Sequence, residues 1–196
     1  MLHNGAGNAV AAGAVVAGWI GLCVVMLTAR RPPAGEGAAK RDASSAFGIA
    51  LQSLGIGAAW AAPIHIDADW PFAREVWIAG APVAALAMLS LLLFIWSAAT
   101  MGRNWSLIAR TREDHKLVQD GPFAVVRHPI YVALFGLMVA AALALGHPVN
   151  LIVAIPLYLW GTLLRVAIEE RLLRNAFGDA YDAYARRVKR FIPGVW

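Results

Sequence analysis

The chain has 196 residues, of which 60% are hydrophobic and 15% charged, and its formal net charge is +5. Soluble domains carry about 25% charged residues, so this composition excludes an ordinary soluble domain and predicts one integral membrane domain. The single cysteine, Cys23, excludes an intramolecular disulfide, and its apolar surroundings predict a packed thiol. Basic residues gathered on one side of a membrane explain the positive charge more simply than nucleic acid binding does.

Five apolar segments are long enough to cross a bilayer, whose core of about 30 Å needs about 20 helical residues. In chain order the predicted spans are 8–28, 46–64, 77–99, 129–146 and 149–168. The first is not expected to be a cleaved signal peptide, because no lysine or arginine precedes it. The second is the weakest, since it is rich in glycine and alanine and carries Gln52 and Ser53. Its small residues favour close helix packing.

The basic residues predict the topology. Of the 17 lysines and arginines, all except Arg74 lie in the loop after the first span, in the loop after the third, or in the tail from Arg165. The positive-inside rule then places the N-terminus outside and the C-terminus in the cytoplasm. An odd number of spans requires that the two ends lie on opposite sides of the membrane, which agrees with this placement. The high alanine and glycine content favours a bacterial inner membrane as the location.

Spans four and five are joined only by His147-Pro148, which predicts a tight helical hairpin. The hairpin returns the chain, so Arg165 and Glu169 near the end of span five should meet the Arg127–Tyr131 start of span four. Arg165 and Glu169 are four residues apart and share a helix face. Alone, this pair is typical of an ordinary salt bridge. Glu170 lies about 100° further round the helix and should face elsewhere.

A Gly121-Pro122 turn and the Arg127-His128-Pro129 helix start face this pair, and together they predict a concave polar site with both charge signs at the cytoplasmic membrane edge. The histidines lack paired ligand spacing, so no zinc or iron site is expected. The sequence contains no P-loop and no G-x-G-x-x-G after a strand. A nucleotide-like cofactor must therefore bind among loops and helix ends.

The tail repeats large apolar residues at spacings of four, three, four and three: Phe177, Tyr181, Tyr184, Val188 and Phe191. Basic residues occupy the positions between them. This pattern predicts an amphipathic C-terminal helix. We expect this helix to lie on the anionic cytoplasmic membrane surface; a cover over the site is the alternative, and the two arrangements are compatible.

Three ordered motifs carry a family resemblance: Leu117-Val118-x2-Gly121-Pro122-Phe123-x3-Arg127-His128-Pro129-x-Tyr131, Arg165-x3-Glu169-Glu170, and Phe177-Gly178-x2-Tyr181-x2-Tyr184. From about Gly102 onward the chain resembles the isoprenylcysteine carboxyl methyltransferase family, and the related phospholipid methyltransferases share part of the pattern. The resemblance implies an all-α integral membrane enzyme that uses S-adenosylmethionine (SAM) without a Rossmann domain. Residues 1–100 would form a three-helix N-terminal part of the single domain, and residues 101–196 the cofactor-binding catalytic part.

The resemblance also implies site roles. Glu169 would hydrogen-bond the cofactor, and Arg165 would hold the substrate carboxylate. The remaining cofactor contacts would come from Arg110, His115, Lys116, Leu117, Val118, Phe123, His128, Pro129, Ile130 and Tyr131. Phe123 stands where the family commonly has tyrosine, which removes one hydrogen bond worth about 1 kcal/mol.

Four functions remain open on the sequence. A carboxylate is already ionised at pH 7, so its methylation needs only positioning, which suits Arg165. A lipidated or lipophilic acid would enter such a site from the bilayer. Phospholipid amine methylation would instead require a base and would place a cation beside Arg165. An NADPH-dependent membrane reductase sharing Arg-His-Pro-x-Tyr and a non-catalytic membrane module are the other two alternatives.

Overall fold

The computed structural model describes residues 4–28, 43–62, 80–102 and 117–195, and these parts are mostly helical. The long helices are α1 (Asn4–Thr28), α2 (Ala43–Trp60), α3 (Gly80–Met101), α4 (Pro129–Ala144) and α5 (Leu151–Phe177). A short helix α6 (Asp179–Arg187) and the 3-10 turns η2 (Gly121–Ala124) and η3 (Pro148–Asn150) complete them. Each predicted span therefore overlaps one long helix, and α5 continues nine residues beyond the predicted end of span five. The predicted limits at residues 64 and 77 lie outside the described residues.

Three of these helices are long and apolar enough to cross a membrane, through Val10–Leu27, Gly80–Met101 and Pro148–Phe177. The apolar helices α2 and α4 are shorter. The 16 residues of α4 extend roughly 24 Å, against a hydrocarbon core of about 30 Å. Large apolar side chains such as Leu89 and Trp96 are exposed on the outer surface, as contact with lipid requires. These features fit an integral membrane protein.

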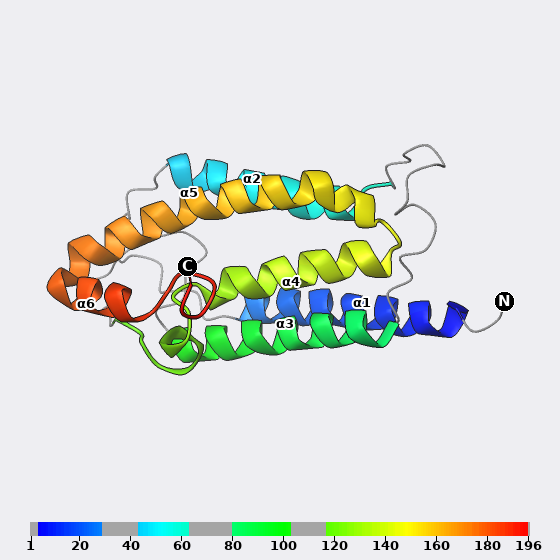
Figure 1. Cartoon of the computed structure of the whole chain (residues 1–196), viewed down its shortest axis with the longest axis horizontal. Helices are drawn as coiled ribbons and strands as arrows, with labels where there is room; N and C mark the ends of the chain where they lie inside the picture. Colours follow the sequence, from blue (N-terminus) through cyan, green and yellow to red (C-terminus); the bar gives the residue numbers. More distant parts are fainter. Residues whose placement is uncertain (1–3, 29–42, 63–79, 103–116, 196) are drawn as a thin grey trace.

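The long helices pack in two groups (Figure 1). Helix α2 lies along α5, whereas α1, α3 and α4 pack against one another. Phe94 of α3 and Leu137 of α4 are fully buried in the second group, surrounded by alanines that let the helices approach closely. Helices α4 and α5 contact each other much less than each contacts its other neighbour.

The connection between α4 and α5 comprises residues 145–150 and is therefore longer than the predicted His147-Pro148, because α4 ends earlier and α5 begins later than the predicted spans. The two helices still run antiparallel from it, as predicted (Figure 1). Asn150, in η3, is buried and its Nδ2 donates to the carbonyls of Ala58 (3.0 Å) and Ala61 (3.2 Å) at the end of α2. This contact ties the connection to α2. The other ends of α4 and α5 then meet at the polar site.

The predicted amphipathic helix of the tail is present as α6, and its apolar side faces the protein. Tyr181, Tyr184 and Val188 are buried, and Leu117, Leu173 and Phe177 pack against them. The apolar face of α6 is therefore covered by the protein itself.

Candidate active site

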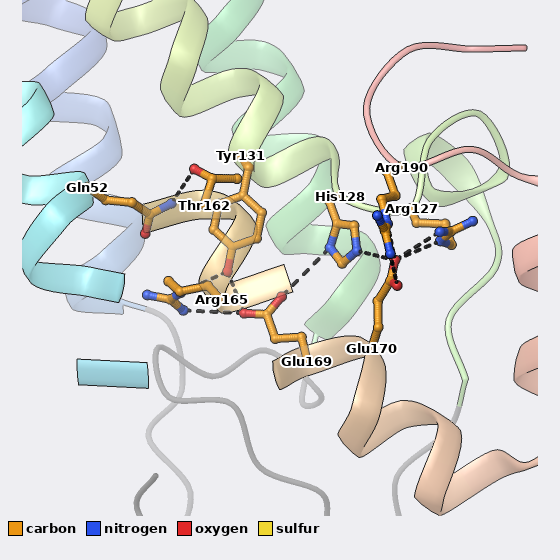
Figure 2. Close-up of polar contacts among 9 residues, drawn as sticks. All are labelled: Gln52, Arg127, His128, Tyr131, Thr162, Arg165, Glu169, Glu170 and Arg190. Atoms are coloured by element: carbon orange, nitrogen blue, oxygen red, sulfur yellow. Dashed lines mark hydrogen bonds and ion pairs between the residues drawn. The ribbon is translucent and has the colours of Figure 1, made fainter. Parts of the chain in front are cut away.

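Figure 2 shows the polar cluster between the first turn of α4 and the last third of α5. The phenol of Tyr131 donates a hydrogen bond to Oε1 of Glu169, and its oxygen accepts one from Nε of Arg165 over 2.9 Å. Nη2 of Arg165 also lies 3.4 Å from Oε1 of Glu169. The structure therefore brings together the three residues that the hairpin was predicted to unite.

The two charged side chains of this cluster, Arg165 and Glu169, differ in how deeply they are buried. The Arg165 side chain is 10% exposed and lies with its guanidinium carbon 5.5 Å from the centre of the Tyr131 ring, whereas the Glu169 side chain is 23% exposed. Removing a guanidinium from water is costly unless it is paired and hydrogen-bonded. Tyr131 and Glu169 supply those partners, so Arg165 is held in one orientation beneath a more accessible carboxylate.

The adjacent residue, Glu170, faces the other way, as its helix position predicts. Its carboxylate accepts from Nη2 of Arg127 (2.9 Å) and from Nη2 of Arg190 (2.7 Å), and its side chain is only 5% exposed. His128 lies between the two carboxylates, with Nε2 3.4 Å from Glu170 and Nδ1 3.7 Å from Glu169. Two consecutive glutamates of α5 thus belong to two different polar clusters that share one histidine.

Backbone hydrogen bonds fix the C-terminal segment beside the start of α4. The amide of Arg127 donates to the carbonyl of Lys189 (2.8 Å), and the amide of His128 donates to that of Arg190 (3.1 Å). Nη1 of Arg127 also donates to the carbonyl of Ala185 over 2.8 Å. The ring of Phe191 lies 5.8 Å from the His128 ring. The tail therefore covers the His128 side of the site.

The predicted Gly121-Pro122 turn forms η2, which packs against α3. Gly121 has a φ of +57°, and a Cβ atom added there would lie 3.0 Å from Oγ1 of Thr100 and 3.2 Å from Nε1 of Trp96. Both the backbone and the close approach therefore require glycine. Two residues on, the carbonyl of Phe123 accepts a 2.7 Å hydrogen bond from Oη of Tyr184. Burial raises the pKa of Tyr184 to about 12, so its phenol remains a donor at neutral pH.

The other residues predicted to contact the cofactor differ in their burial and in what they pack against. Pro129 is buried at the start of α4, and the half-buried Leu117 packs against α6. Val118 is half-buried. Ile130 packs against the core formed by α1, α3 and α4, so its side chain serves packing there. The remaining three lie outside the described residues: Arg110, His115 and Lys116.

Sequence reasoning missed the Glu170 cluster and the contribution of α2. Nothing in the pattern pairs Arg190 with Glu170, because the tail's position depends on how α6 turns back. Gln52 stood out as a polar residue in an apolar span, and it donates to Oγ1 of Thr162, one turn before Arg165 (Figure 2). Among the described residues, no group of three or more histidine, cysteine, aspartate or glutamate side chains is placed to bind a metal ion.

The fold and the site define a helical membrane protein with a cation–phenol–carboxylate cluster at the ends of two antiparallel helices. Comparison with known proteins adds the family: residues 83–175 match the model of the isoprenylcysteine carboxyl methyltransferase family. This segment runs from α3 almost to the end of α5, and through it the chain is similar to that family. Helix α2 and the C-terminal segment lie outside it.

Individual relatives show the same similarity. The chain is 36% identical over 115 residues to a protein-S-isoprenylcysteine O-methyltransferase of Schizosaccharomyces pombe, covering 56% of this chain and 48% of the relative. It is 28% identical over 129 residues to a probable protein-S-isoprenylcysteine O-methyltransferase of Oryza sativa subsp. indica, covering 64% and 67%. It is also 34% identical over 99 residues to the cobalt-zinc-cadmium resistance protein CzcN of Cupriavidus metallidurans, covering 50% and 45%. The chain thus spans about half the length of several curated relatives that it matches.

Proposed function

We propose that the chain is a membrane methyltransferase that transfers a methyl group from SAM to the carboxylate of an isoprenylcysteine-like lipophilic acid. The observation that carries the proposal is the buried Arg165, held by Tyr131 and Glu169 inside the family segment. A guanidinium in a fixed orientation is suited to bind a carboxylate through two parallel hydrogen bonds. An arginine in an apolar helix is costly and therefore points to function.

The residues of the site fit SAM by their chemistry. SAM supplies a methyl group on a positively charged sulfur, together with a cationic amino group. The partly exposed carboxylate of Glu169 is a suitable acceptor for that positive charge and for hydroxyl donors. His128 is buried beside it, with Nδ1 3.7 Å from its carboxylate, and Pro129 is buried at the start of α4. Leu117, Val118 and Phe123 would line the approach from η2 and the preceding loop.

The chain's own contribution to this reaction is positioning. An acceptor carboxylate with a reference pKa of about 4 is ionised at neutral pH, so no side chain has to remove a proton. Arg165 would orient the acceptor oxygens, and Tyr131 would hold Arg165 at a fixed place relative to Glu169. The covering tail beside His128 would limit the access of water. Holding two reactants in one geometry is sufficient to supply a large part of a rate enhancement.

The proposal includes a membrane arrangement. Helices α2 and α4 pack along helices long enough to span, so we place all five helices across the bilayer with the N-terminus outside. The concentration of basic residues around the site supports a cytoplasmic site and C-terminus. A lipophilic acceptor would then reach Arg165 from the bilayer while its carboxylate stays at the membrane edge. We propose the inner membrane of a bacterium as the location.

Calorimetric titration of the purified protein with SAM and, separately, with NADPH tests the cofactor. We expect micromolar binding of SAM by the intact protein and a large loss of affinity in Glu169→Gln. Thermal unfolding of this variant should show that it is still folded, which separates lost binding from lost folding. Binding of NADPH without binding of SAM would contradict the proposal and favour a reductase.

A further inference from the structure

We infer that Gly48 of α2 is a positioning residue for Arg165, because its missing side chain leaves the space in which the arginine stem lies. Helix α2 lies outside the family segment, yet it packs along α5, which carries Arg165. The inference deepens the proposed function and rests on its assignment of Arg165 to the acceptor carboxylate.

The helices α2 and α5 touch backbone to backbone beside Arg165. A Cβ atom added at Gly48 would lie 2.7 Å from Cγ of Arg165 and 3.1 Å from the carbonyl oxygen of Gly161. A Cβ atom added at Gly161 would lie 2.6 Å from the carbonyl oxygen of Gly48. The distances of 2.7 Å and 2.6 Å are shorter than real Cβ contacts, and that of 3.1 Å is tight, so an alanine at position 48 must displace the arginine stem or separate the helices.

A buried hydrogen bond fixes α2 at this crossing. Nε2 of Gln52 donates to Oγ1 of Thr162 over 2.8 Å, and the two residues are 7% and 2% exposed. Gln52 lies one turn after Gly48, and Thr162 lies one turn before Arg165. In an apolar environment such a pair opposes sliding or rotation of one helix along the other, since either would leave a buried polar group unpaired.

Both the stem and the guanidinium of the Arg165 side chain are therefore held in place. Gly48 limits its stem from α2, while Tyr131 and Glu169 hold its guanidinium, as Figure 2 shows for the polar contacts. A displacement of Cγ moves the guanidinium relative to both partners. Misplacing a positioning group by about 1 Å is able to lower a rate by roughly 100-fold. The N-terminal half of the chain thus takes part in acceptor recognition through a residue that never touches the acceptor.

Three glycines of α2 provide a matched series. Gly48→Ala adds a methyl group against Arg165. Gly55→Ala adds one at the same helix interface two turns further along α2, where the new Cβ would lie 2.7 Å from the backbone nitrogen of Tyr158 rather than against Arg165. Gly57→Ala adds one where no atom lies within 4 Å. The substitution and the helix are the same in each, so only the surroundings differ.

We expect Gly48→Ala to lower kcat/KM for a prenylcysteine acceptor by about tenfold or more while SAM affinity stays within about twofold. Gly55→Ala should lower the Tm without a comparable change in the acceptor KM, and Gly57→Ala should behave like the unmodified protein. If Gly48→Ala retains the full kcat/KM, or if Gly48→Ala and Gly55→Ala lose activity in proportion to their loss of Tm, the inference is wrong.

A second readout does not depend on activity. In protein labelled with ¹⁵N-arginine, the Nε–H resonance of Arg165 is assigned by its loss in Arg165→Lys. We expect Gly48→Ala to shift this resonance and Gly55→Ala and Gly57→Ala to leave it in place. An unmoved resonance in Gly48→Ala would overturn the inference. If the unmodified protein methylates no prenylcysteine, the proposed function fails and this resonance still decides the role of Gly48.

If Gly48→Ala does not fold, Gln52→Ala tests the control of Arg165 by α2 instead. It removes the hydrogen bond to Thr162 without adding an atom at the crossing, so its effect on the Arg165 resonance has the same expected direction. An unshifted resonance in Gln52→Ala would then reject the control of Arg165 by α2.

Discussion

The phenol of Tyr131 on α4 donates a hydrogen bond to the carboxylate of Glu169 on α5, and the same oxygen accepts from Arg165. One hydroxyl therefore links the cation that we assign to the acceptor and the anion that we assign to the cofactor. Both assignments share this oxygen. We therefore expect a substitution at any one of the three residues to change the affinity for both the acceptor and SAM.

Tyr131→Phe tests this link. The variant keeps the ring under Arg165 and removes the hydroxyl, so the arginine and the glutamate each lose a partner. Hydrogen bonds to charged groups contribute about 1.5–3 kcal/mol, which predicts a loss in kcat/KM of roughly 10- to 100-fold. We expect both the acceptor KM and the SAM dissociation constant to rise in steady-state kinetics and calorimetry. A change confined to one of the two constants would show that Tyr131 does not couple the sites.

Arg165→Lys tests the shape of the cation rather than its charge. A lysine ammonium is a point charge and does not form the two parallel hydrogen bonds of a guanidinium with a carboxylate. We expect kcat/KM for the acceptor to fall by roughly 10- to 100-fold, with a smaller change in SAM affinity transmitted through Tyr131. Activity equal to that of the unmodified protein would show that Arg165 does not bind the acceptor carboxylate.

The consecutive glutamates of α5 should respond differently to the same substitution. Glu169→Gln should weaken SAM binding and lower the Tm less than Glu170→Gln does, because the Glu169 side chain is partly exposed and the amide oxygen still accepts from Tyr131 and Arg165. Glu170→Gln leaves Arg127 and Arg190 without their carboxylate, and breaking a buried ion pair of this kind costs about 3 kcal/mol of folding free energy. Thermal unfolding followed by circular dichroism measures the difference.

Arg174→Ala is the control for Glu170→Gln. It breaks a 2.9 Å ion pair between Arg174 and Asp182 that also joins α5 to α6, but both side chains are largely exposed. Its Tm should therefore stay close to that of the unmodified protein. Equal losses of Tm in the two variants would mean that the tail is held simply by any contact between α5 and α6.

Gly121→Ala tests the turn before α4. The substitution meets both an unfavourable positive φ and the side chains of Thr100 and Trp96. Gly146→Ala meets a similar φ of +75° with no atom within 4 Å, so it isolates the backbone contribution of about 1–2 kcal/mol. We expect Gly121→Ala to lower the Tm more than Gly146→Ala and to weaken SAM binding as well. Equal effects would show that the contact with α3 is unimportant.

Much of the arrangement follows from local sequence patterns. Apolar length predicted all five long helices, and the two-residue connection His147-Pro148 predicted that Arg165 and Glu169 would meet Tyr131. These predictions succeed because helix rise and a short turn leave the chain few alternatives. The roles of these residues toward SAM and an acceptor remain predictions.

Contacts between distant segments were not predictable in the same way. Spacing placed Gly48 and Gln52 in an apolar helix but did not indicate that α2 would lie along α5 beside Arg165. Hydrophobic periodicity likewise predicted an amphipathic tail without indicating which surface would cover Tyr181 and Tyr184. Both outcomes depend on which helices become neighbours, and a single sequence does not encode that choice locally.

Methyl transfer tests the central claim most directly. The protein in lipid nanodiscs is incubated with SAM carrying a tritiated methyl group and with an N-acetylated S-prenylcysteine, and the product is treated with base. A carboxyl methyl ester releases its label as volatile methanol under base, whereas a methylated amine does not. We predict base-labile label in the prenylcysteine with the unmodified protein and a large loss of it in Arg165→Lys. Base-stable label in the nanodisc phospholipids, or no transfer despite SAM binding, would contradict carboxyl methylation.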